Sequence, residues 1–79
     1  MFLCKVIASV VSQQKEDCLV GKKMLLCERI DGEKPEKIVA VDLTGAGIGS
    51  EVLVSRRYGA VGQDSLIDDW IVGIVDSIS

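Results

Sequence analysis

The residues whose spacing most suggests chemistry are three alternating glycines in a short loop. This loop, which we call the glycine loop, consists of Thr44, Gly45, Ala46, Gly47, Ile48 and Gly49. A glycine-rich loop holds phosphate when it follows a strand, opens a helix and, in the NTPase form, ends in Lys and then Ser or Thr. Here it leads into the β-branched run VLV, no lysine follows, and the carboxylate of Glu51 would repel an anion. We therefore expect neither nucleotide nor other cofactor at this loop.

The sequence lacks the partner residues that nucleophilic and acid–base catalysis require. The chain has no histidine, so its serines and cysteines have no base of the usual kind. Asp68 and Asp69 are adjacent and diverge on either a strand or a helical turn, so a paired-carboxylate device is not expected. Asp42 interrupts an apolar run and is expected to accept hydrogen bonds from the loop backbone, with a functional carboxylate as the less favoured interpretation. We expect no catalytic residue and no enzyme.

The three cysteines do not have the spacing of a metal site or of a disulfide framework. Histidine, the commonest metal ligand, is absent. Cys4 and Cys27 lie in apolar runs, where free cysteine behaves as a small hydrophobe. Cys18 lies in a polar segment and is the one most expected to react. We therefore expect no metal, and three free thiols favour a reducing cytosol.

Composition argues against nucleic acid and in favour of self-association. Of the 79 residues, 48% are apolar but only 4% aromatic, more aliphatic material than a small monomer readily buries. The net charge of −3 leaves no basic surface. Arg56, Arg57 and Tyr58 are the only basic-aromatic cluster, and the arginines are expected to pair with carboxylates, on their own surface or across a subunit contact. No signal peptide or membrane-length apolar run is recognised, so no membrane association is expected.

Alternating and apolar runs predict five strands separated by turns. The expected strands cover residues 2–13, 23–30, 38–43, 51–55 and 70–78. Residues 31–37, DGEKPEK, predict a hairpin loop, and residues 63–69 hold at most one helical turn. The pattern indicates one all-β domain over residues 1–79, a small five-stranded barrel, closed or nearly so, of the oligonucleotide-binding type. The last strand is apolar on both faces, so we expect another subunit to cover its second face.

The order and spacing of several segments resemble the vertex proteins of bacterial microcompartments, the pentameric EutN/CcmL type. The segments are LCKV at 3–6, GKKMLL at 21–26, AVD at 40–42, GAGIG at 45–49, VLV at 52–54 and IVGIVD at 71–76. Two features depart from the family pattern. Residues 55–60 read SRRYGA where a Gly-Ser-Ser-Ala-Arg-like stretch is common, and Cys4 stands where glycine is frequent.

The resemblance implies a structural role. It implies a cytoplasmic homopentamer that plugs the vertices of a polyhedral shell, whose facets are tiled by hexameric shell proteins. We expect the glycine loop, residues 44–49, to lie near the five-fold axis and border a narrow opening, because its bare backbone permits close approach of symmetry mates. The alternative is an oligonucleotide-binding-type module for single-stranded nucleic acid, which would require a basic, aromatic-lined face that the sequence lacks.

Overall fold

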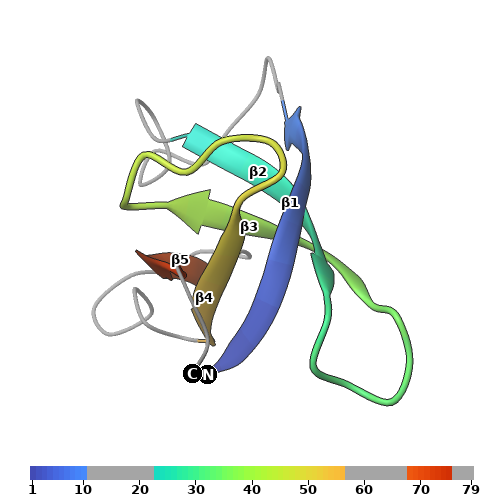
Figure 1. Cartoon of the computed structure of the whole chain (residues 1–79). Helices are drawn as coiled ribbons and strands as arrows, with labels where there is room; N and C mark the ends of the chain where they lie inside the picture. The colour runs from blue at the N-terminus through green and yellow to red at the C-terminus, as the bar shows by residue number, and fades with distance from the viewer. Residues whose placement is uncertain (11–22, 57–67, 76–79) are drawn as a thin grey trace.

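The computed structural model describes residues 1–10, 23–56 and 68–75, which form five β-strands (Figure 1). The strands are β1 (Phe2–Val10), β2 (Lys23–Arg29), β3 (Lys37–Asp42), β4 (Glu51–Arg56) and β5 (Asp69–Ile74). They close into a barrel in the order β1-β2-β3-β5-β4. The pairing is antiparallel except between β3 and β5, which run parallel. The predicted all-β, five-stranded barrel is confirmed.

The strand boundaries differ from the sequence-based expectation by a few residues, because cross-strand partners decide where pairing stops. β3 begins one residue early because Lys37 pairs with Glu28, and β4 extends to Arg56, which pairs with Asp69. Asp69 therefore opens β5 and is not part of a helical turn. β5 was expected to reach residue 78 but ends at Ile74. Residues 11–13, 63–67 and 76–78 of the expected elements lie outside the described part.

The β2–β3 connection is a hairpin, as the charged DGEKPEK segment predicts. Residues 31–37 are all exposed. The hairpin is closed by the Arg29 amide, which donates to the Glu36 carbonyl at 2.8 Å. Nearby, the Ile30 amide donates to the Leu3 carbonyl of β1 at 2.9 Å. The loop therefore projects from the barrel end at which β1 begins (Figure 1).

The interior of the barrel is filled by small aliphatic side chains from all five strands. β1 contributes Phe2, Cys4 and Val6 by strict alternation. A register shift between Val6 and Ala8 then changes the face that the later residues occupy. Alternation continued from Phe2 would place Val10 on the interior face as well, which the structure shows to be wrong. Val10 packs instead against a second cluster on the outside of the barrel wall.

The second cluster follows one row of neighbouring residues across four strands. Val10 pairs with Met24, Met24 with Val41, and Val41 with Trp70. Met24, Val41 and Trp70 are each at most 5% exposed. Because Ile71 points into the barrel interior, β5 buries apolar side chains on both faces. The second face was expected to need another subunit, but at Trp70 it is already buried within the single chain.

Cys4 and Cys27 are fully buried members of the interior cluster. Burial raises the pKa of the Cys4 thiol from 9.0 to about 12 and that of Cys27 to about 11. The folded protein therefore holds these two protons more tightly than the unfolded chain. The resulting stabilisation is complete below pH 9 and is lost as the pH rises towards 11 and 12.

We expect both thiols to resist alkylation in the native protein. At pH 9 iodoacetamide should modify Cys4 and Cys27 slowly in buffer and quickly in concentrated urea, because the thiolate is the reactive form and both side chains are shielded. Peptide mass mapping over time measures the two rates separately. Equal rates in buffer and in urea would contradict the buried, protonated state.

Candidate functional site

The glycine loop closes one end of the barrel. It connects β3 to β4, which are separated in the barrel by β5 (Figure 1). Ala46 is 1% exposed and packs into the interior cluster, so the middle of the loop plugs the barrel opening. The end of the loop is joined to β1 by two hydrogen bonds. The Gly49 amide donates to the Val6 carbonyl at 2.8 Å, and the Val6 amide donates to the Ser50 carbonyl at 2.9 Å.

Asp42, the last residue of β3, fixes the first half of the loop. Its Oδ1 accepts hydrogen bonds from the amide and the hydroxyl of Thr44, at 2.8 and 2.9 Å. Its Oδ2 accepts from the Ala46 amide at 2.9 Å. The prediction that Asp42 accepts hydrogen bonds from the loop backbone is confirmed, and its oxygens are occupied by structural contacts.

Lys23 holds the same residue, Ala46, through the next peptide group. It lies opposite Asp42 in the β2–β3 register, and its Nζ donates to the Ala46 carbonyl at 2.8 Å. Ala46 is therefore held through both its N–H and its C=O. The role of Lys23 cannot be predicted from the sequence, because only the strand register places this residue beside Asp42. The one available signal was a charged residue opening an apolar strand.

The glycines of the loop serve two different purposes. Gly45 and Gly49 have φ of 80° and 91°, a conformation in which an L side chain is strained. Gly47 is not among the positive-φ glycines, and a Cβ built on it would meet no atom within 4 Å. Within the part of the chain that the structure describes, nothing therefore requires glycine at position 47.

The surface of the loop carries aliphatic groups and backbone. Ile48 is 71% exposed and Leu43, immediately before the loop, is 47% exposed. No charged residue occurs between Asp42 and Glu51.

Among the described residues, no group of three His, Cys, Asp or Glu side chains gathers in a way that suits a metal ion. The same part of the chain contains no helix with the length and hydropathy of a membrane span. The exposed aliphatic side chains and uncharged backbone of the loop suit contact with another protein surface.

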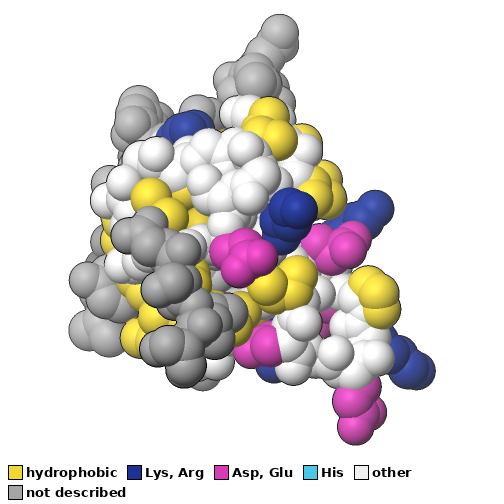
Figure 2. Space-filling model, in the orientation of Figure 1, with side chains coloured by type: hydrophobic (Ala, Val, Ile, Leu, Met, Phe, Trp, Pro, Cys, Tyr) yellow, Lys and Arg dark blue, Asp and Glu magenta, His cyan; other side chains and the backbone are white. Residues whose placement is uncertain are grey.

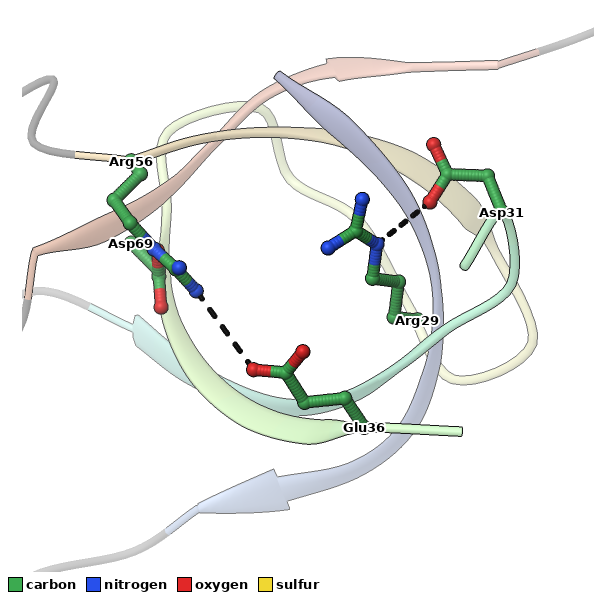
Figure 3. Close-up of polar contacts among 5 residues, drawn as sticks. All are labelled: Arg29, Asp31, Glu36, Arg56 and Asp69. Carbon is green, nitrogen blue, oxygen red and sulfur yellow. Dashed lines mark hydrogen bonds and ion pairs between the residues drawn. The ribbon is translucent and has the colours of Figure 1, made fainter. Parts of the chain in front are cut away.

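The opposite end of the barrel is charged (Figure 3). Arg56 Nε lies 2.9 Å from Asp69 Oδ1, and Arg56 Nη2 lies 3.9 Å from Glu36 Oε1. Hydrogen bonding to Asp69 raises the pKa of Arg56. The expected pairing of Arg56 with carboxylates is confirmed within one subunit, while Arg57 and Tyr58 lie outside the described residues. Asp69 therefore acts as an ion-pair partner.

A second ion pair lies at the same end. Arg29 Nε is 2.9 Å from Asp31 Oδ1, and Asp31 Oδ2 accepts a hydrogen bond from the Leu3 amide at 3.1 Å. The hydrogen bond from Arg29 is the main reason that the pKa of Asp31 lies below its usual range. The guanidinium groups of Arg29 and Arg56 lie 4.8 and 5.2 Å from the centre of the Phe2 ring. These cation–π contacts cap the interior cluster at this end.

This fold defines a small structural barrel with a rigid loop across one end and ion pairs around the other. Residues 1–76 match the family described as ethanolamine utilisation protein EutN/carboxysome. The chain belongs to this EutN/CcmL family.

Proteins that are similar in sequence and in structure support the assignment to this family. The chain is 44% identical over 90 residues to the bacterial microcompartment shell vertex protein PduN of Salmonella typhimurium, covering 100% of this chain and 99% of that protein. It is 42% identical to the carboxysome shell vertex protein CcmL of Thermosynechococcus vestitus, with 100% and 87% covered. The solved GrpN pentameric microcompartment shell protein of Rhodospirillum rubrum superimposes with a TM-score of 0.83 at 41% identity, covering 100% and 98% of the two chains.

Proposed function

We propose that this protein is a structural subunit that forms homopentamers at the vertices of a bacterial microcompartment shell. The observation that carries the proposal is the match to the pentameric GrpN shell protein, which extends over the whole chain at a TM-score of 0.83. A ring also suits the composition, because it gives the aliphatic surplus of a 79-residue chain a second place to be buried.

We propose that the subunit acts by contact and carries out no catalysis. The support is the surface of the glycine loop, which offers aliphatic side chains and backbone and lacks charged groups. Asp42 and Lys23 are committed to holding the loop. In this proposal the pentamer is cytoplasmic and meets the hexameric proteins that tile the shell facets.

We place the glycine loop near the five-fold axis, bordering the central opening. Gly47 supports this placement, because neither its φ nor its neighbours among the described residues require glycine. A bare backbone at this position leaves room for an approaching symmetry mate. The tight turn between Gly47 and Ser50, with a backbone hydrogen bond of 3.0 Å, gives the loop one defined shape for such a contact.

The alternative of a module for single-stranded nucleic acid loses support from the burial of the two aromatic side chains that the structure describes, Phe2 and Trp70. Such modules stack bases on exposed aromatic rings in a positive groove. Phe2 is 7% exposed and Trp70 is 3% exposed, so neither ring is available for stacking. The family relatives are named as shell vertex proteins, which also favours the structural role.

Native mass spectrometry of the purified protein tests the proposed assembly. We expect the dominant species to have five times the 8.5 kDa subunit mass. Analytical ultracentrifugation over a range of concentrations checks that the species persists in solution, since assembly depends on subunit concentration. A stable monomer, or a ring of another size, at micromolar concentration would refute the homopentamer.

A further inference from the structure

The two ends of the barrel differ sharply in chemistry. Among the described residues, the large exposed apolar side chains at the end closed by the glycine loop are Ile7, Leu43, Ile48 and Ile74, with exposures of 37, 47, 71 and 43%. β3 and β5 run parallel and both finish at this end, and β1 rises towards it. On the face seen in Figure 2, the acidic side chains lie over the middle and lower parts of the molecule. The ion pairs of Arg29 and Arg56 surround the other end.

The four aliphatic residues fall into two pairs. Ile7 directly follows Val6, whose carbonyl accepts the Gly49 amide, and Ile48 directly precedes Gly49. Ile7 and Ile48 form what we call the β1 flank. Leu43 follows the end of β3, its amide donates to the Ile71 carbonyl of β5 at 3.2 Å, and Ile74 ends β5. Leu43 and Ile74 form what we call the β3–β5 flank.

The two flanks lie on opposite sides of the barrel mouth. In the closed order β1-β2-β3-β5-β4, the neighbours of β1 are β2 and β4. β3 and β5 are therefore the strands across the barrel from β1. The glycine loop runs from one flank to the other, held by Asp42, Lys23 and the hydrogen bonds to Val6. Because the loop is held in this way, little conformational freedom remains to be lost when its side chains meet a partner.

We propose that the β1 flank of one copy packs against the β3–β5 flank of the next copy in the ring. This inference rests on the proposed homopentamer and names the surfaces that meet in it. A cyclic ring joins two different patches of each subunit, in contrast to a two-fold dimer, which joins one patch to itself. The two flanks are different, and the side chains that define them are all aliphatic and exposed. This contact leaves the barrel mouth free to face the ring centre, where the glycine loop is proposed to lie.

A charge-exchange pair tests the contact. Ile48→Glu and Leu43→Lys alter one side chain on each flank, and both positions are exposed in the single subunit. Each single variant places an unpaired charge against an apolar flank of the neighbour. We expect each subunit contact to weaken by about tenfold to a hundredfold, as loss of one buried isoleucine or leucine side chain implies, so the rings should dissociate at higher protein concentrations than those of the wild type. The double variant places Glu against Lys at every contact and should recover rings.

Ile30→Glu is the matched control. Ile30 is 45% exposed, similar to Leu43, but lies at the charged end of the barrel. We expect native mass spectra of this variant to match those of the wild type. Circular dichroism of every variant shows whether the barrel itself remains folded. If either of the first two variants fails to fold, Ile7→Glu and Ile74→Lys form a second pair on the same two flanks.

The outcomes separate this inference from the proposed function. If the wild type is not a pentamer, the proposed function fails before any variant is considered. If the wild type is a pentamer and the single variants assemble as it does, the flanks face solvent or another shell protein, and the inference is overturned. If the single variants dissociate and the double variant does not recover, the flanks do not meet each other, which also overturns it.

Discussion

Gly47→Trp is expected to give a folded barrel that fails to assemble into pentamers. Among the described residues of one subunit, a Cβ at Gly47 meets no atom within 4 Å, so the new side chain can begin without a clash. Gly47 is exposed and is not among the positive-φ glycines, so an L residue is tolerated by the backbone. At the proposed position near the axis, five indoles would compete for one narrow opening. Native mass spectrometry should show monomers in place of pentamers, with circular dichroism unchanged.

Gly47→Ala is the control for Gly47→Trp. A methyl group fits the same open space and adds little bulk at the axis. We expect this variant to retain both the pentamer and the wild-type denaturation midpoint. Normal pentamers from Gly47→Trp would remove the glycine loop from the axis, and an unfolded Gly47→Trp subunit would show that the position matters within the barrel.

The sequence predicts local structure well where one face of a strand is consistently apolar. Phe2, Cys4 and Val6 alternate with half-buried or exposed residues and do fill the interior. The alternation does not reveal the register shift that follows Val6, because a β-bulge depends on how β1 meets β2. The parallel pairing of β3 with β5 cannot be predicted from this alternation either, since it joins residues nearly thirty positions apart.

At the candidate site, too, roles set by neighbouring residues can be predicted from the sequence, whereas roles set by strand pairing cannot. The role of Asp42 follows from local sequence, because a carboxylate that ends an apolar strand before a bare loop has nearby amides to accept from. The role of Lys23 depends on the register that sets it opposite Asp42. Pairing of Arg56 with a carboxylate is expected from its type, but the identity of Asp69 as its partner comes only from the β4–β5 pairing.

Asp42→Ala is expected to lower the free energy of unfolding by about 2–3 kcal/mol, because it removes hydrogen bonds that a charged acceptor makes in a partly buried site. The amide and hydroxyl of Thr44 and the amide of Ala46 lose their acceptor together. Ala46 is 1% exposed, so water does not readily replace the carboxylate there. Urea denaturation at one fixed protein concentration measures the change, since pentamer formation also contributes to apparent stability.

Asp31→Ala is the control for Asp42→Ala. It shows whether removing an aspartate elsewhere in the barrel lowers the free energy of unfolding to the same extent. Asp31 also accepts a backbone amide and an arginine, but at the exposed, opposite end of the barrel. We expect its removal to change stability little and to leave hydrogen exchange at the Thr44 and Ala46 amides as in the wild type. Asp42→Ala should speed exchange at both amides, because the loop loses its principal acceptor. If Asp42→Ala matches the wild type in stability and exchange, Lys23 and the Gly49–Val6 hydrogen bond are sufficient to hold the loop.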